Sequence, residues 1–217
     1  MGAAVPANAV SAKVVALDAL LNAQTVWRGQ PLAQPGHPGH AGEPTGHPEL
    51  DAALPQRGWP KRALTEVLIA ADGIGELALV LPTLARMTGD KRTVVVIAPP
   101  YIPYAPAWKA HGIDLRHLEI VDAGERDALW AFEQCLRSGA CAAVLGWPRQ
   151  ADPQSLRRLQ VAADSGDCIG FAFRDRKHLA NPSPAALRIE LDGAQAWIRK
   201  CRGTNAALHP LALTRRH

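Results

Sequence analysis

The stretch ALTEVLIAADGIGELALVLPTL, residues 63–84, decides the fold that we expect for this chain. It opens on a short apolar run, residues 64–69, which has the length and the β-branched content of one buried strand. Small residues follow up to Gly75, and beyond them leucines recur at helical spacing, at Leu77, Leu81 and Leu84. A strand, a glycine-bearing turn and a helix in this order form the layout of a phosphate-binding loop.

The residues of this loop do not suit a nucleotide. In the pattern G-x-x-x-x-G-K-[ST], Gly75 takes the second glycine, and Ala70 stands where the first is needed. Glu76 occupies the lysine position, where a carboxylate opposes a triphosphate, and Leu77 occupies the hydroxyl position, where it cannot bind magnesium. With Gly73 in the turn, these residues form a degenerate loop, for which we predict no cofactor and no metal.

Strand and helix patterns alternate along the rest of the chain. Further strands are predicted at 92–98, 118–121, 141–145 and 168–173, and helices at 49–54, 76–88, 103–112, 125–137 and from 153 onward. Near the end the period changes to two, in a hairpin of residues 187–191 and 197–200. The fold class predicted is therefore α/β, with a mostly parallel sheet flanked by helices and an antiparallel C-terminal hairpin.

Three parts are predicted along the chain. Residues 1–43 form an arm, in which one helix carries a short apolar stripe and a Pro/Gly-rich linker follows. Residues 44–201 form the core, and residues 202–217 a basic, flexible tail. The stripe, which is expected to dock on a neighbouring surface, consists of Val10, Val14, Leu17 and Leu21. Three histidines lie in the Pro/Gly-rich stretch of residues 28–48 and are not interpreted as metal ligands, because no cysteine or paired carboxylate accompanies them: His37, His40 and His47.

Composition excludes several classes of protein. The apolar content of 47% and the charged content of 20% are globular values, and no apolar run approaches the length of a membrane span. No basic leader precedes the N-terminal apolar stretch, so we expect a cytoplasmic protein without a membrane partner. The cysteines form no C-x-x-C pair and are interpreted as buried free thiols: Cys135, Cys141, Cys168 and Cys201.

Positive charge is concentrated in the last third of the chain, because residues 1–150 carry a net charge of −1 and residues 151–217 a net charge of +5. Such an excess suits an anionic partner such as DNA, although it is also common on a solvated surface. The candidate contacts lie after the predicted 168–173 strand and on the final hairpin: Arg174, Arg176, Lys177, Arg199, Lys200 and Arg202.

The order of motifs resembles the ATPase core of the bacterial recombinase RecA, over roughly residues 44–201. More specifically it resembles the RecA-like, translesion-synthesis-associated ImuA family, which is described as SulA-related. The motifs that carry this resemblance are Val26-Trp27-Arg28-Gly29, Pro44-Thr45-Gly46-His47, Gly58-Trp59-Pro60, Gly73-Ile74-Gly75-Glu76-Leu77 and the run from Ala98 to Tyr104.

The resemblance implies a RecA-like core and an accessory role in the SOS DNA-damage response. Its implied partners are RecA, the Y-family polymerase-like protein ImuB and an error-prone replicative-type polymerase, with DNA as a further candidate. It implies no catalysis, because Pro99-Pro100 and Gly146-Trp147 stand where RecA carries its catalytic glutamate and its magnesium-side aspartate.

Two alternatives of other classes stay open. One is a SulA-like inhibitor of cell division. The other is a nucleotide-dependent, DNA-binding ATPase with an unorthodox site, in which Asp51, Asp72 and Glu76 hold a metal. No spacing ties these three acids together, so the sequence favours a non-catalytic interaction protein.

Overall fold

The computed structural model describes residues 41–204 and 209–213. The chain divides into two compact units, residues 1–33 and residues 34–217, and only the second contains described residues. The predicted arm helix, with Val10, Val14, Leu17 and Leu21, therefore lies outside the described residues, as do His37 and His40.

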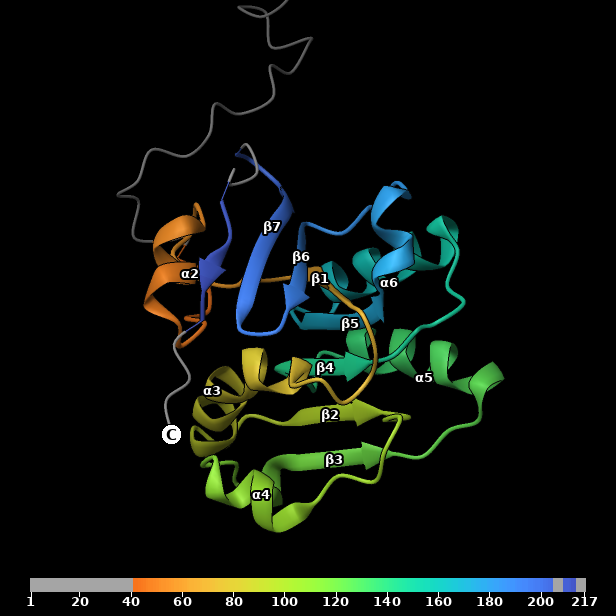
Figure 1. Ribbon diagram of the computed structural model, residues 1–217. Helices are drawn as coiled ribbons and strands as arrows, with labels where there is room; N and C mark the ends of the chain where they lie inside the picture. The colour runs from red at the N-terminus through yellow and green to blue at the C-terminus, as the bar shows by residue number, and fades with distance from the viewer. Residues whose placement is uncertain (1–40, 205–208, 214–217) are drawn as a thin grey trace, which may run out of the picture. The chain divides into compact units, whose positions relative to one another are not determined.

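The second unit is built on one eight-stranded sheet with the strand order β3-β2-β4-β5-β1-β6-β7-β8 (Figure 1). The first six strands run parallel, and β7 and β8 are antiparallel additions at one edge. In chain order the strands are β1 Ala63–Ile69, β2 Val94–Ile97, β3 Leu118–Val121, β4 Ala143–Gly146, β5 Ile169–Asp175, β6 Leu187–Asp192, β7 Gln195–Cys201 and β8 Leu211–Ala212.

Helices cover both faces of this sheet, as alternating strands and helices require. The core on one face takes its helical side chains from α2, α3 and α4, and the core on the other takes them from α5 and α6. The α-helices are α2 Pro48–Ala53, α3 Glu76–Gly89, α4 Ala105–Ala110, α5 Glu125–Arg137 and α6 Pro153–Ser165, and the 3-10 helices are η1 Leu115–His117 and η2 Arg176–Ala180.

The fold class predicted from the sequence is confirmed at this level: a mixed α/β fold, a mostly parallel sheet flanked by helices, and antiparallel C-terminal strands. The predicted N-cap of α6 is also present, since the Asp152 carboxylate accepts a hydrogen bond from the Ser155 N–H at 2.6 Å. The end of the chain was predicted to have no regular structure. In fact Leu211 and Ala212 form β8, whose Leu211 pairs with Ala196 of β7.

Residues 42–47, which span the predicted boundary between arm and core, pack tightly on the rest of the core. Gly42 and Glu43 exchange backbone hydrogen bonds with residues 56–59, and a Cβ on Gly46 would lie 2.4 Å from the ring of Pro82 in α3. His47 is buried, with Nε2 at 3.1 Å from the carbonyl oxygen of Leu79. The ring of His47, which lies within the predicted core of residues 44–201, is therefore a fixed part of the contact with α3.

A buried ion pair adds to this contact. The Glu43 carboxylate accepts hydrogen bonds from Arg86 at 2.8 Å and from Arg92 at 3.1 Å. Burial alone raises the pKa of Glu43, but the two arginines outweigh burial and hold that pKa below the ordinary value of 4.5.

Because the pKa is lowered in the folded state, Glu43 stabilises the fold above pH 4.5, and this contribution is lost as pH falls below it. We expect Glu43→Gln to lower the free energy of unfolding at pH 7 by about 1–3 kcal/mol. The variant should also lose less stability than the parent between pH 6 and pH 3. Urea unfolding at both pH values measures this, with the exposed Glu119→Gln as control. Equal acid sensitivity of parent and Glu43→Gln would contradict it.

Candidate functional site

The loop between β1 and α3 lies at the carboxyl edge of the parallel strands, where open α/β sheets bind their ligands (Figure 1). Gly73 and Gly75 have φ angles of 80° and 104°, a left-handed conformation that glycine adopts without strain. A Cβ on Gly73 would lie 3.1 Å from the ring of Tyr101, so the loop after β2 lies directly against this one.

The chain's own carboxylate occupies the anion-binding backbone of this loop. Glu76 is 3% exposed, and its two carboxylate oxygens accept hydrogen bonds from the N–H of Gly73 at 3.0 Å and of Gly75 at 3.2 Å. A negative charge is also favourable here because Glu76 is the first residue of α3, at the positive end of the helix dipole. Two of the amides that would cradle a phosphate are thus already bonded to an internal anion.

We therefore expect magnesium–ATP to bind with a dissociation constant weaker than about 1 mM, or less than about 4 kcal/mol of binding free energy. Glu76→Ala should not create a tight site, because Leu77 still stands where a magnesium-binding hydroxyl is needed. Equilibrium titration with a fluorescent ATP analogue, for the parent and for Glu76→Ala, measures both. Low-micromolar binding, or hydrolysis that Glu76→Ala abolishes, would contradict the prediction.

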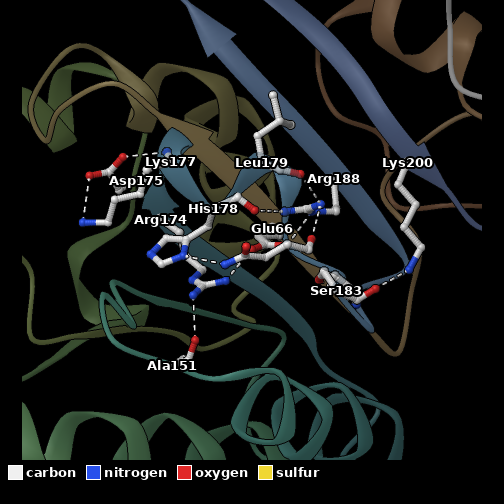
Figure 2. A network of polar contacts seen from close by, with 12 residues as sticks. Glu66, Ala151, Arg174, Asp175, Lys177, His178, Leu179, Ser183, Arg188 and Lys200 are labelled. Atoms are coloured by element: carbon white, nitrogen blue, oxygen red, sulfur yellow. Dashed lines mark hydrogen bonds and ion pairs between the residues drawn. The ribbon is translucent and has the colours of Figure 1, made fainter.

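A buried charge network lies on the α6 face of the sheet, beneath this edge. Glu66 in the central strand β1 is fully buried, and Figure 2 shows it between Arg174 of β5 and Arg188 of β6. Arg174 Nη1 donates to Glu66 Oε1 and Arg188 Nε donates to Glu66 Oε2, each at 2.7 Å. One carboxylate therefore joins three neighbouring strands through charge-assisted hydrogen bonds.

The same two arginines fix the loops at the edge of the sheet. Arg174 Nη2 donates to the carbonyl of Ala151, in the loop before α6, at 2.6 Å. Arg188 donates to three carbonyls in and after η2, of His178 at 2.9 Å and of Leu179 and Asn181 at 3.1 Å. Sequence reasoning missed this network, because Glu66 and Thr65 were counted within an apolar run although both are fully buried polar residues.

Arg174 was predicted as a candidate contact for DNA or a partner, but it does not lie at the surface. Its side chain is 3% exposed and is paired with Glu66. Arg176 and Lys177 of η2 are exposed, and Lys177 pairs with Asp175 at 3.3 Å. The sequence thus correctly placed charge at the end of β5, but the first of the three cations points into the core.

The remaining candidates lie on or just after β7. Arg199 pairs with Glu190 at 2.6 Å and stacks over the Trp197 ring at 4.8 Å. Lys200 is half-buried and donates to the Ser183 carbonyl at 2.6 Å, and its pKa is lowered by burial and then by nearby arginines. Arg202 is exposed. The predicted basic residues thus fall into two groups: cations that are exposed to solvent, and cations that are held by hydrogen bonds or ion pairs within the chain.

A cleft of about 460 Å³ opens between the loop after β2, the start of α5 and the loop after β4. Its apolar lining includes Ile97, Leu129 and Phe132, and Arg149 at its rim is paired with Asp72 of the β1–α3 loop. Beside it, the loop after β2 carries strongly exposed apolar side chains: Tyr101 at 65%, Ile102 at 96% and Tyr104 at 69%. The sequence signal was the run from Ala98 to Tyr104, which we used only as a family motif.

Among the described residues, the cysteines, the possible metal ligands and the helices indicate no further functional site. All four cysteines are unpaired, and only Cys168 is fully buried, which raises the pKa of its thiol. Within residues 41–204 and 209–213, no three His, Cys, Asp or Glu side chains gather as a metal site. None of the helices in this part of the chain is long and apolar enough to cross a bilayer.

Comparison with known proteins finds similarity to two SulA proteins. No protein-family model matches the sequence. Over 105 residues the chain is 33% identical to the cell division inhibitor SulA of Edwardsiella piscicida, a match that covers 46% of this chain and 61% of that protein. Part of the chain is SulA-like in sequence. The crystal structure of SulA from Pseudomonas aeruginosa matches with a TM-score of 0.44 and 22% identity, over 51% of this chain and 96% of that one.

Proposed function

We propose that this chain is a non-catalytic protein that acts by binding another protein, and that it inhibits cell division in the SOS DNA-damage response. The observation that carries this proposal is the 33% identity to a SulA protein over 105 residues. That protein is named a cell division inhibitor, and the chain spans about three-fifths of its length. From the sequence alone, this function was one of the alternatives. The similarity to SulA favours it over a role in translesion synthesis.

The geometry of the β1–α3 loop supports a function without nucleotide chemistry. Glu76 takes the amides of Gly73 and Gly75 that a phosphate needs. By contrast, Ile102 and its neighbours offer exposed apolar surface at the same edge, which in monomeric proteins marks a site for a protein partner.

Controlled expression of the full chain in a rod-shaped bacterium tests the proposal. We expect cells to grow into long filaments while DNA synthesis continues, as measured by microscopy with a DNA stain. The control is Trp59→Ala, which removes a fully buried side chain and should lower the amount of folded protein in the cell and, with it, the length of the filaments. Normal cell length, at a level of soluble parent chain confirmed by immunoblot, would overturn the proposal.

The second candidate is an accessory role in translesion synthesis with RecA, ImuB and an error-prone polymerase. It is favoured because the match to SulA covers only 46% of this chain and therefore leaves more than half of the chain unexplained. The motifs from Val26 to Gly29 and from Ala98 to Tyr104 carry the resemblance to the ImuA family. This candidate predicts that deletion of the gene lowers mutation frequency after ultraviolet damage. Full-chain pull-down of RecA, with and without Val14→Asp and Leu17→Asp, tests the proposed docking of the arm.

Direct DNA contact belongs to this second candidate and now rests on Arg176, Lys177 and Arg202 as exposed cations. For single strands each phosphate contact contributes a log–log salt slope of about −0.7. The triple change to alanine should therefore weaken binding at low salt and flatten the slope by about 2. Arg116→Ala, which removes an exposed cation on η1, is the control. A slope that the triple change leaves unaltered would place the DNA surface elsewhere.

A further inference from the structure

The cleft is lined by α5 and by the loops that follow β2 and β4, at the carboxyl ends of these strands. Helix α5 lies on the opposite face of the sheet from α3 and α4 (Figure 1). Its volume of about 460 Å³ falls within the range of pockets that enclose a small ligand or a large side chain. Phe132 and Leu129 of α5 line it together with Ile97, and Trp147 is fixed by stacking on Phe173 at 4.9 Å. An apolar group that enters the cleft therefore meets a preformed apolar lining.

The charged groups at the rim divide into paired and unpaired ones. Arg149 is bound to Asp72, and Glu125 accepts a hydrogen bond from Gln150 at 2.9 Å. Asp122 is exposed, and within the described part of the chain no hydrogen bond or ion pair joins its carboxylate to another residue. The cation at the rim is thus neutralised in place, whereas Asp122 and the partly satisfied Glu125 leave the mouth acidic. A bound group with a positive charge complements this rim.

An exposed apolar ridge continues from the same edge. Pro99 lines the cleft, and three and five residues further along the chain Ile102 and Tyr104 are 96% and 69% exposed. Tyr101, immediately before Ile102, lies on one side against Gly73. A small polar ligand would not use this ridge, but a polypeptide that fills the cleft would also cover part of it.

We propose that the cleft and the 99–104 ridge bind a segment of a partner protein that inserts one aromatic or long aliphatic side chain into the cleft. A lysine or arginine next to that side chain lies against Asp122 and Glu125. The inserted side chain is the buried anchor that dominates such interfaces, and the basic neighbour sets specificity. This inference deepens the proposed function, since it rests on action through a protein partner and names the chemistry of that partner's segment.

The test titrates the isotope-labelled full chain with three short peptides and follows its backbone and indole resonances. The first peptide has a central tryptophan flanked by lysines. The second replaces the tryptophan with alanine, and the third replaces the lysines with glutamates. We expect the first to shift the resonances of Leu129, Gly146 and the Trp147 indole, and to bind at least about tenfold more tightly than either of the others.

Variants of the chain separate the cleft from its surroundings. Asp122→Lys should weaken the tryptophan–lysine peptide at least about tenfold, whereas the matched control Asp127→Lys, on the first turn of α5 but outside the cleft, should not. Ala128→Trp fills the cleft and should abolish the shifts. Since Ala128→Trp also risks misfolding, Ile102→Asp on the exposed ridge serves as a second variant, with an expected loss of severalfold.

Any of three results in the peptide titrations would overturn the proposal: equal binding of all three peptides, shifts confined to residues outside the cleft, or an equal effect of Asp122→Lys and Asp127→Lys. A parent chain that sediments as a dimer, and that Ile102→Asp turns into a monomer, would overturn it in favour of a second copy of the chain as occupant. The filament assay stays separate, because filaments without peptide binding refute only this inference. Peptide binding without filaments refutes cell-division inhibition and leaves the docking surface standing.

Discussion

Replacing Glu66 by alanine is expected to lower the free energy of unfolding by about 3–5 kcal/mol. The change removes the one carboxylate that pairs with both Arg174 and Arg188, whose side chains are 3% and 8% exposed. Two guanidinium groups would then stay buried without a counter-charge, and this penalty exceeds the loss of any single surface contact. Relative to the roughly 5–15 kcal/mol that stabilises most domains, the loss would bring the chain close to unfolding. Chemical denaturation followed by circular dichroism measures it.

A matched control comes from the neighbouring strand. Glu190→Ala removes the same side chain from β6, where its partner Arg199 is 37% exposed, and should cost less than about 1 kcal/mol. A loss of similar size for both variants would contradict the special role of Glu66. So would a Glu66→Ala chain that unfolds at the same denaturant concentration as the parent.

Replacing the whole network with apolar side chains separates the contribution of its charges to stability from the contribution of its contacts with the loops. Buried ion networks replaced by apolar side chains of similar volume are often neutral in stability. We therefore expect the combined change Glu66→Leu, Arg174→Met and Arg188→Met to recover much of the loss of Glu66→Ala. It should not recover hydrogen-exchange protection in the segment after β5, because the three carbonyl contacts of Arg188 are gone.

Periodicity was enough to predict the order of the elements. The bounds of β3 and α5 agree with the sequence prediction to the residue, because a short apolar strand and an amphipathic helix are local patterns. The two-residue strand β8 has no such pattern of its own. It exists only because the exposed edge of β7 pairs with it, so the sequence near it reads as irregular.

In the candidate site, the contacts between residues far apart in the chain could not be predicted from the sequence. Glu66 lies 108 residues from Arg174 and 122 from Arg188, and only the assembled sheet places β5 and β6 on either side of β1. The loss of a lysine at position 76 could be predicted from the motif. The hydrogen bonds of the Glu76 carboxylate to Gly73 and Gly75 could not be predicted, because they depend on the left-handed turn that the loop adopts.

Trp59 lies in a motif, Gly58-Trp59-Pro60, that the sequence used for recognition, and the structure gives it a packing role. It is fully buried, meets the Phe171 ring edge-on at 5.1 Å, and donates its indole N–H to the Thr83 hydroxyl at 2.9 Å. That hydroxyl lies 2.8 Å from the carbonyl oxygen of Pro44, so the indole also positions the segment before α2.

Trp59→Ala should therefore cost about 3–5 kcal/mol, through the cavity that it leaves and the hydrogen bond that it removes. Trp130→Ala, which truncates the same side chain at a site that is 64% exposed, should change the free energy of unfolding by no more than about 0.5 kcal/mol. Urea unfolding of the parent and of both variants measures the difference. A small loss for Trp59→Ala would mean that the contacts around residues 42–47 do not hold the first elements of the core together, and that the motif owes its presence to something other than packing.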